Sequence, residues 1–121
     1  LPRSGRHDEL VVGLTAGHLK AAGLDYVFGY AEPSQRTAIV SLSHLTERPA
    51  GRRGGRRLLV ERVVKEVLHE TGHLMGLEHC DQAHCLMHYS QALQDTDVKE
   101  RGYCSRCLTE MSRLPETAGD V

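Results

Sequence analysis

The chain has 121 residues, with 15 basic and 16 acidic side chains and a formal net charge of −1. This length predicts a single domain over residues 1–121, able to bury about two-thirds of its unfolded surface. The balanced charge argues against attraction to nucleic acid or to membrane surfaces. With four tyrosines, one phenylalanine and no tryptophan, the core should be largely aliphatic. We expect residues 1–9 and 116–121 to be tails.

Three short strands are expected in the first third of the chain. Leu10–Thr15 is a short apolar run rich in valine; periodicity does not separate helix from strand here, but its shortness and composition favour a buried strand. Asp25–Tyr30, which is followed by turn-forming residues, and Thr37–Leu42 are the other two. Between the first two strands, Gly17–Gly23 predicts a turn or a short helix.

Arginine and glycine make up the whole of Gly51–Arg57, with four arginines and three glycines. The arginines could bind phosphates, but no aromatic side chains interleave with them to stack on bases. A solvated loop is therefore favoured over a nucleic-acid-binding zinc protein, which is kept as a third functional hypothesis.

From Arg57 to about Met75 the pattern becomes helical. The apolar residues of this segment recur at helical spacing and form one stripe: Leu59, Val63, Val67 and Leu74. Three charged residues fall elsewhere on the same helix: Arg62, Lys65 and Glu66.

Two shorter helices are expected toward the C-terminus. Asp95–Lys99 predicts a single helical turn. A final helix should begin near Cys104 and end before Pro115, because proline cannot continue a helix. Its apolar face is expected to consist of three residues: Leu108, Met111 and Leu114.

The segment His69–His79 reads HETGHLMGLEH, which is a metal-binding pattern. His69 and His73 are four residues apart, so on a helix they lie one turn apart on the same face and can reach one metal ion. Gly76 can leave the helix in a left-handed conformation, so that His79 returns as a third ligand. Three protein ligands and an open position are typical of catalytic zinc. The alternative is an amphipathic helix end with exposed histidines.

The four cysteines form two pairs, Cys80 with Cys85 and Cys104 with Cys107. This spacing predicts one structural zinc site that uses all four. Two disulfides or free thiols are the alternatives. Disulfides would suit a secreted protein, but the sequence shows no signal peptide and no apolar run long enough to span a membrane, so a cytoplasmic location is expected.

The pattern that begins at His69, with HExxHxxGxxH followed by Cys80, Cys85 and Met87 and later by a CxxC pair, resembles the archaemetzincins, a branch of the metzincin zinc metalloproteases. The resemblance covers about residues 10–114. It implies an α/β (α+β) fold: a compact metzincin-like domain with a small twisted mixed sheet packed on the active-site helix and a zinc-knuckle C-terminal part. Met87 would lie in a Met-turn beneath the three histidines, whereas the sequence alone makes it a buried apolar residue. The family generally has a further strand and helix upstream, which nothing before Leu10 supplies.

The motif and the resemblance together predict a zinc-dependent peptidase that cleaves peptide or protein substrates. Two zinc ions are expected, one catalytic on the three histidines and one structural on the cysteines. Glu70, beside the first ligand, should take a proton from zinc-bound water and pass it to the leaving amine, unless it is an ordinary helix-surface carboxylate. No nucleic-acid or membrane partner is expected. The main alternative is a zinc-stabilised, catalytically silent module that binds peptides or partners.

Two finer features follow from the likeness to metzincins. The substrate is expected to lie as an extra strand against an edge strand, matched here by Ala38–Leu42. Tyr89, two residues after the methionine, resembles a tyrosine of astacin-type metzincins that can ligate zinc and hold the oxyanion. The alternative for Tyr89 is a partly buried side chain that packs through its ring.

Overall fold

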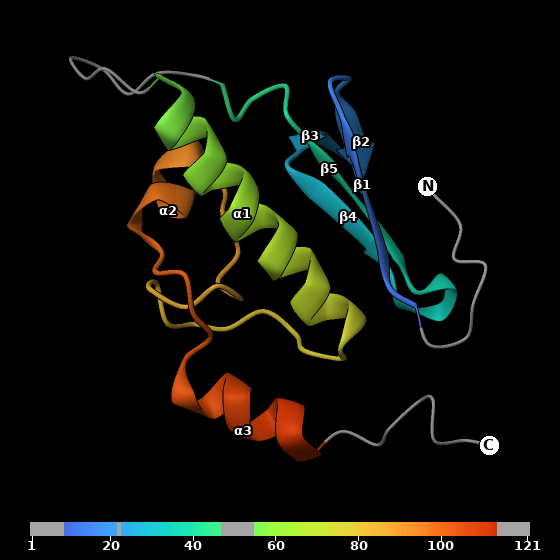
Figure 1. Cartoon of the computed structure of the whole chain (residues 1–121), viewed down its shortest axis with the longest axis vertical. Helices are drawn as coiled ribbons and strands as arrows, with labels where there is room; N and C mark the ends of the chain where they lie inside the picture. Colours follow the sequence, from blue (N-terminus) through green and yellow to red (C-terminus); the bar gives the residue numbers. More distant parts are fainter. Residues whose placement is uncertain (1–8, 22, 47–54, 114–121) are drawn as a thin grey trace.

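The computed structural model describes residues 9–21, 23–46 and 55–113 (Figure 1). A small sheet lies on one side of the long helix α1 (Gly55–Leu74), and the short helix α2 (Leu93–Val98) packs on the other. Helix α3 (Ser105–Arg113) lies beyond the C-terminal end of α1. The mixed α/β class predicted from the sequence is confirmed. The expected tails, apart from Glu9, and residues 51–54 of the arginine–glycine segment fall outside the described residues. The loop expected over this segment is wrong at Gly55–Arg57, which form the start of α1.

The main sheet has three strands in the order β1–β5–β4. Strand β1 (Val11–Thr15) runs parallel to β5 (Thr37–Ser41), and β4 (Gly29–Glu32) runs antiparallel to β5. A short 3₁₀ turn (Pro33–Gln35) joins β4 to β5. Strand β5 is therefore central, and four of its five side chains are buried. Burial on both faces explains why its sequence is a continuous run rather than an alternation.

A two-stranded hairpin precedes this sheet. Strand β2 (Leu19–Ala21) pairs antiparallel with β3 (Leu24–Val27), and Gly23 lies in the turn between them with φ 77°. The turn or short helix expected over Gly17–Gly23 is therefore wrong where β2 lies. Three residues are too few to show the alternation by which a strand is recognised.

The strand expected over Asp25–Tyr30 is broken at Phe28. Residues before the break belong to β3 in the hairpin, and those after it belong to β4 in the main sheet. The Phe28 ring is buried with Val40 and Leu45, so it anchors the chain where it passes from one sheet to the other. Because aromatic and aliphatic residues stand on both sides of the break, the sequence pattern continues across it.

Helix α1 packs its apolar stripe on the sheet, where Leu59, Val63 and Val67 contact the Phe28–Val40–Leu45 cluster. The charged residues expected on its other faces are nevertheless buried. They meet α2 and the segments around it, which supply polar partners. A pattern that registers only apolar residues therefore misses a second packed face of the helix.

The contacts of Arg62 and Lys65 show how α2 satisfies these charges. The Arg62 guanidinium donates to both carboxylate oxygens of Asp97 at 2.8 Å and to the Leu45 carbonyl at 2.9 Å. The Lys65 ammonium donates to the carbonyl oxygens of Thr96 and Asp97 at 3.3 Å. Such hydrogen bonds offset the cost of removing the charges from water.

Between α1 and α2, residues 75–92 form turns and bends with no helix or strand. Their core consists of Leu77, Met87 and three of the cysteines, and Tyr103 and Met111 pack against it. The apolar face expected on α3 is wrong at Leu108, which is 52% exposed, because Cys107 faces inward instead. The expected third member of that face, Leu114, lies outside the described residues.

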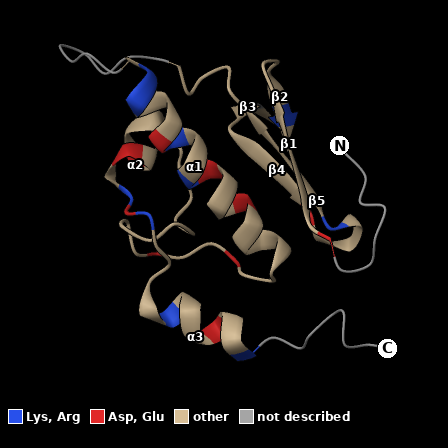
Figure 2. Ribbon diagram, viewed as in Figure 1, with Lys and Arg blue, Asp and Glu red and all other residues tan. Residues whose placement is uncertain are grey.

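Acidic and basic residues are interspersed along α1 and α3 (Figure 2), so positive and negative charges balance along these helices as they do over the whole sequence. Over the described part of the chain, no helix combines the length and apolar character needed to cross a membrane.

Candidate active site

The histidine motif lines a cleft of about 480 Å³ beside the sheet. Tyr26–Ala31, which includes the start of β4, forms one wall. Glu66, His69, Glu70 and His73 line the cleft from α1. The rest of the lining consists of Pro33, Gly76–His79, Tyr89–Gln91 and Lys99. The cleft therefore joins the regular half of the molecule to the loops that follow α1.

The three histidines of the motif come together at this cleft. Their ring nitrogens lie within 4.8 Å of one another. Nδ1 of His69 is 2.6 Å from the Leu86 carbonyl oxygen, and Nδ1 of His73 is 2.9 Å from that of Leu77. A carbonyl oxygen can only accept, so Nδ1 carries the hydrogen and Nε2 keeps the lone pair that a metal ion needs.

The end of α1 places His79 beside the other two rings. Gly76 has φ 95°, in the left-handed region that favours glycine. Leu77 N–H donates to the Gly72 carbonyl at 2.9 Å, and Gly76 N–H donates to that of His73 at 3.0 Å. This pair of bonds is a Schellman motif, which ends the helix sharply and turns the chain back.

Met87 is fully buried against α1. A Cβ built on Gly72 would lie only 2.3 Å from its Sδ atom, so the thioether fills the space that a side chain at that position would need. The Tyr103 hydroxyl donates to the Leu68 carbonyl at 2.6 Å and closes the same side of the helix. The helix carrying the histidines therefore rests directly on the loop that contains Met87.

Glu70 is buried beside β4, where a Cβ on Gly29 would come within 2.6 Å of its Oε2 atom. Burial, the largest cause, and the neighbouring carboxyl group of Glu66 together raise the pKa of Glu70 to about 9, while the positive charge of Lys99 opposes the shift. Burial, with the positive charge of Lys99, lowers the pKa of His69 to about 3. The His69 imidazole is therefore neutral at pH 7, which is the form that binds metal ions.

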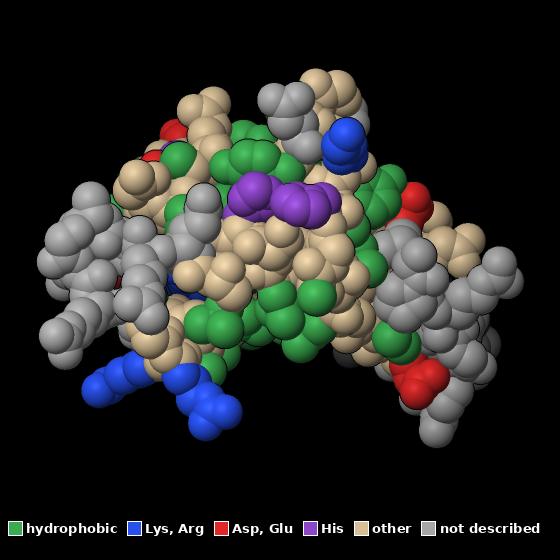
Figure 3. Space-filling view, turned by 90° about the horizontal axis from the view of Figure 1, so that it is seen from above, with side chains coloured by type: hydrophobic (Ala, Val, Ile, Leu, Met, Phe, Trp, Pro, Cys, Tyr) green, Lys and Arg blue, Asp and Glu red, His purple; other side chains and the backbone are tan. Residues whose placement is uncertain are grey.

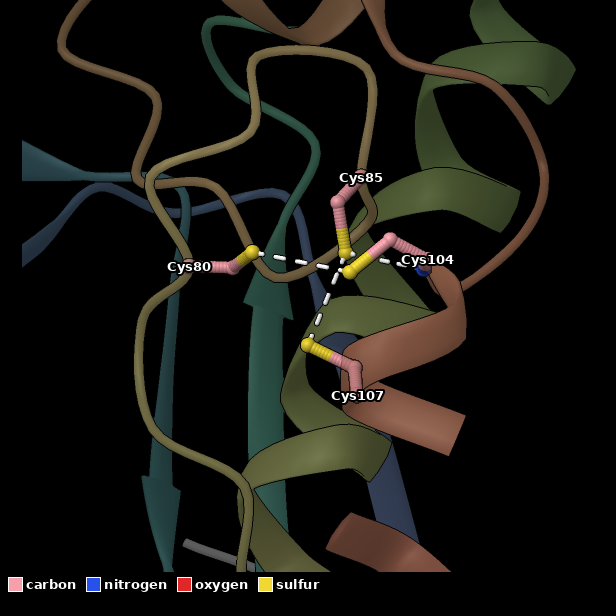
Figure 4. A group of neighbouring side chains, drawn as sticks. All are labelled: Cys80, Cys85, Cys104 and Cys107. Atoms are coloured by element: carbon pink, nitrogen blue, oxygen red, sulfur yellow. Dashed lines mark hydrogen bonds between the residues drawn. The ribbon is translucent and has the colours of Figure 1, made fainter. Parts of the chain in front are cut away.

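The four cysteine sulfurs converge from the loop after α1 and from the start of α3 (Figure 4). Sγ of Cys80 is 3.7 Å from that of Cys104, and Sγ of Cys85 is 3.8 Å from that of Cys107. A zinc ion about 2.3 Å from four tetrahedral sulfurs places them about 3.8 Å apart, whereas a disulfide needs about 2.0 Å. The four thiols are free, so their spacing fits a metal ion and not the disulfide alternative.

Several donors point at these sulfurs. Backbone N–H groups of Cys104 and Met87 donate to Cys85 Sγ at 3.2 and 3.4 Å, and the Arg106 guanidinium donates to Cys80 Sγ at 3.1 Å. A hydrogen bond from the backbone of Cys107 lowers the pKa of the Cys104 thiol to about 7. Burial raises the pKa of the Cys85 and Cys107 thiols, and the two backbone donors oppose this shift at Cys85. Donors of this kind favour the thiolate form, which is the ligand that zinc requires.

Residues 8–113 match the family model described as Peptidase family M54. The chain belongs to peptidase family M54. The archaemetzincin of Thermococcus kodakarensis is 43% identical to it over 102 residues, which cover 84% of this chain and 55% of that protein. The resemblance to archaemetzincins predicted from the motif is thus confirmed. This M54 chain spans about half the length of the curated relatives it matches.

Two crystal structures resemble the fold of this M54 chain. The archaemetzincin from Methanopyrus kandleri superposes with a TM-score of 0.77 at 40% identity, covering 90% of this chain and 58% of that one. A zinc-dependent peptidase from Methanocorpusculum labreanum gives a TM-score of 0.79 at 36% identity, covering 86% and 55%. The sheet, α1 and the loops that carry the histidines therefore form a known arrangement.

The M54 chain differs from the sequence-based expectation in the strand that faces the cleft. Ala38–Leu42 was expected to be the edge strand, but β5 is paired on both sides, with β1 and with β4. The strand at the edge of this sheet beside the cleft is β4. Three of its residues line the cleft: Gly29, Tyr30 and Ala31. Sequence order alone does not reveal which strand is central.

Tyr89 of the M54 chain lies on the cleft wall and is 38% exposed. Its ring centroid is 5.2 Å from that of His79, so the tyrosine packs beside the third histidine. This position is open to both interpretations of Tyr89, a packing residue and a group that contacts the substrate.

Two buried residues of the M54 cleft were missed by the sequence analysis. Glu66 lies four residues before Glu70, so it shares the same helix face, and this spacing was the signal available. Side-chain ligand atoms of Glu66, His69 and Glu70 all lie within 4.8 Å of one another. Lys99 reaches the cleft from beyond α2, and no local pattern marks it.

A further pair of histidines lies outside the cleft lining of the M54 chain. His18 Nδ1 is 3.2 Å from His44 Nε2, and the Tyr26 ring stacks on His44 with centroids 4.0 Å apart. Histidine side chains gather on the face seen in Figure 3, with hydrophobic residues around them. One imidazole donates the hydrogen of this bond and the other accepts it.

Proposed function

We propose that this chain carries the zinc-dependent peptidase site of its family. The observation that supports this most strongly is the convergence of three histidine rings within 4.8 Å, with Nδ1 of His69 and His73 held by carbonyl oxygens. The remaining Nε2 atoms suit zinc, which accepts neutral imidazole ligands and leaves a position open in catalytic sites. Glu70 in the same cleft supplies a base that a purely structural site does not need.

A zinc ion held by His69, His73 and His79 would act as a Lewis acid toward a carbonyl oxygen and would acidify a water molecule. The chain's own contribution is proton transfer. Glu70 accepts the proton of the attacking water and returns it to the nitrogen of the leaving amine. Burial favours the protonated form of Glu70, whereas a cation beside it favours the carboxylate. Metal binding would therefore lower the pKa of Glu70 and favour the form that accepts a proton.

The substrate is proposed to lie in extended form along the free edge of β4. Backbone groups of an edge strand can pair with a peptide whatever its side chains, which predicts broad specificity. Gly29 keeps this edge close to Glu70, because no side chain intervenes between them. Tyr89, on the opposite wall, is the residue available to contact the oxyanion from the side of His79.

A second zinc ion is proposed at the four cysteines, where it would have a structural role. The set of four sulfurs leaves no ligand position for a substrate, as is usual in structural zinc sites. Cys80 directly follows His79, and the Cys80 N–H donates to the Met87 carbonyl at 2.9 Å. Fixing Cys80 therefore fixes both the third histidine and the loop beneath the site.

The experiment that tests the peptidase is a digest of a peptide library by the wild type and by Glu70→Gln. The variant should lose about 10²–10⁴-fold in turnover, the usual contribution of a general base. Elemental analysis should find two zinc ions per chain in both proteins. Glu61→Gln, on the same helix but outside the cleft lining, is the matched control and should cleave like the wild type.

A wild-type chain that binds two zinc ions but cleaves no peptide would instead support the silent binding module. Equal turnover by Glu70→Gln and wild type would remove Glu70 as the base. A zinc content of one would contradict the second metal site.

A further inference from the structure

Behind the histidines lies a buried lysine that the proposed reaction does not use. Lys99 is 3% exposed, and Glu66 and Glu70, at 4% each, are equally enclosed. Among the described residues that line the cleft, Lys99 is the only lysine or arginine. Removing an ammonium group from water costs several kcal/mol unless charges and acceptors replace the water, so its surroundings are informative.

The acceptor that Lys99 uses is shared with a zinc-binding histidine. Its ammonium donates to the Leu86 carbonyl at 3.3 Å, and Nδ1 of His69 donates to the same oxygen at 2.6 Å. A carbonyl oxygen has two lone pairs and can accept both. The Leu86 N–H donates to the Gly102 carbonyl at 3.1 Å, so both ends of this peptide group are held.

The acidic groups around Lys99 include Glu70, the proposed base, and its neighbour Glu66. Glu66 is the acidic group that interacts most strongly with the Lys99 ammonium, followed by Cys85 and Glu70. Glu66 is in turn hydrogen-bonded to Glu70. One ammonium group therefore contacts the carbonyl that supports His69 and interacts with the carboxyl groups of Glu66 and Glu70, the second of which is the proposed base.

We propose that Lys99 is a positioning residue that fixes the His69 imidazole and the Glu70 carboxyl group relative to each other. It acts through the Leu86 carbonyl on one side and through Glu66 on the other. This inference rests on the proposed peptidase site but adds a residue from a distant segment, 29 positions beyond Glu70 in the sequence. Groups that orient metal ligands from outside typically change metal affinity or activity by about 10–100-fold when they are removed.

Lys65 offers a matched control for the test. It is also buried, at 8% exposure, and its ammonium also donates to backbone carbonyls, those of Thr96 and Asp97. It does not line the cleft. Replacing Lys65 with methionine therefore removes a buried ammonium of the same kind without touching His69 or Glu70.

The experiment measures zinc affinity at the histidine site by competition with a chelator, for the wild type, Lys99→Met and Lys65→Met. Lys99→Met should bind zinc about 10–100-fold more weakly there. The zinc-saturated variant should show a lower kcat with little change in KM. Lys65→Met should keep the wild-type affinity and kcat, whatever its melting temperature. Zinc at the cysteines should be retained in all three proteins.

Wild-type zinc affinity and kcat in Lys99→Met would overturn the proposal, as would equal losses in Lys65→Met. If Lys99→Met fails to fold, the double variant Lys99→Met, Glu66→Gln leaves no unpaired buried charge, and its comparison with Glu66→Gln alone isolates the effect of Lys99. If the wild type cleaves no peptide, the peptidase proposal fails while the affinity measurement still decides the role of Lys99.

Discussion

The backbone is held in place differently in the described residues of 9–74 and in residues 75–113. The first segment, the sheet–helix region, has strand ladders and a helix packed on an apolar core of Phe28, Val40 and Leu45. The second, the cysteine region, has no helix or strand before residue 93, and its core is built around the cysteines and Met87. Two of the three histidines stand on the first region and the third on the second.

This difference shows how a small domain can combine a rigid platform with precisely placed loops. A strand or helix fixes each residue through its own backbone hydrogen bonds. A loop has no such ladder, so its conformation depends on cross-links and on a few long-range contacts. In the cysteine region those cross-links would be sulfur–metal bonds, which tie residues 80 and 85 to residues 104 and 107. We therefore expect the two regions to respond differently to mutation and to metal removal.

The largest effect is expected from Cys104→Ser. A structural zinc site contributes about 10–16 kcal/mol in zinc-finger peptides, whereas a whole domain is stable by only about 5–15 kcal/mol. The variant should lose order over the cysteine region, seen as rapid amide exchange at Leu86 and Cys80, whose N–H groups are bonded in the folded chain. A chelator strong enough to strip the wild type should reproduce this result.

Ser105→Ala, at the exposed position next to Cys104, is the matched control and should melt like the wild type. Wild-type melting of Cys104→Ser itself would show that the cysteine region does not depend on its sulfurs.

A smaller effect, about 2–5 kcal/mol, is expected from Leu45→Ala. Leu45 is fully buried in the sheet–helix core, so the substitution leaves a cavity there. Denaturant melts should show this loss both with zinc present and after chelation, since the cavity is remote from the sulfurs. Leu14→Ala, at a 55% exposed position on β1, should change stability by less than about 0.5 kcal/mol. A Leu45→Ala cost that disappears without zinc would mean that the two regions form one cooperative core.

The smallest effect concerns the junction of the two regions. Alanine at Gly72 should gain about 1 kcal/mol of helix propensity, but its Cβ would lie 2.3 Å from Met87 Sδ. Forcing an atom into a packed core costs about 1–3 kcal/mol, so Gly72→Ala should be modestly destabilising. In a Met87→Ala background the same change should become neutral or favourable. Equal effects in both backgrounds, measured by denaturant melts, would show that the regions do not meet at this point.

The sequence predicted the features that are set by local spacing. His69 and His73 are four residues apart on a helix, and Gly76 ends that helix in the left-handed conformation that brings His79 back. The apolar stripe of α1 and the strand at Thr37–Ser41 also follow from local patterns.

What the sequence did not predict depends on contacts between distant segments. The central position of β5 is set by its pairing with both β1 and β4. Arg62 is buried because Asp97 lies opposite it, 35 residues away. Lys99 reaches His69 through a carbonyl on a third segment. No local periodicity contains such information, and an exposed or a buried charge looks the same in the sequence.

The close approach of Gly29 to Glu70 has a consequence for how this protein can change over generations. Each amino acid that a single base change can make from a glycine codon carries a Cβ atom. At position 29 that atom would lie 2.6 Å from the Glu70 carboxylate oxygen. Every substitution at position 29 that a single base change can produce therefore requires the Glu70 side chain to shift.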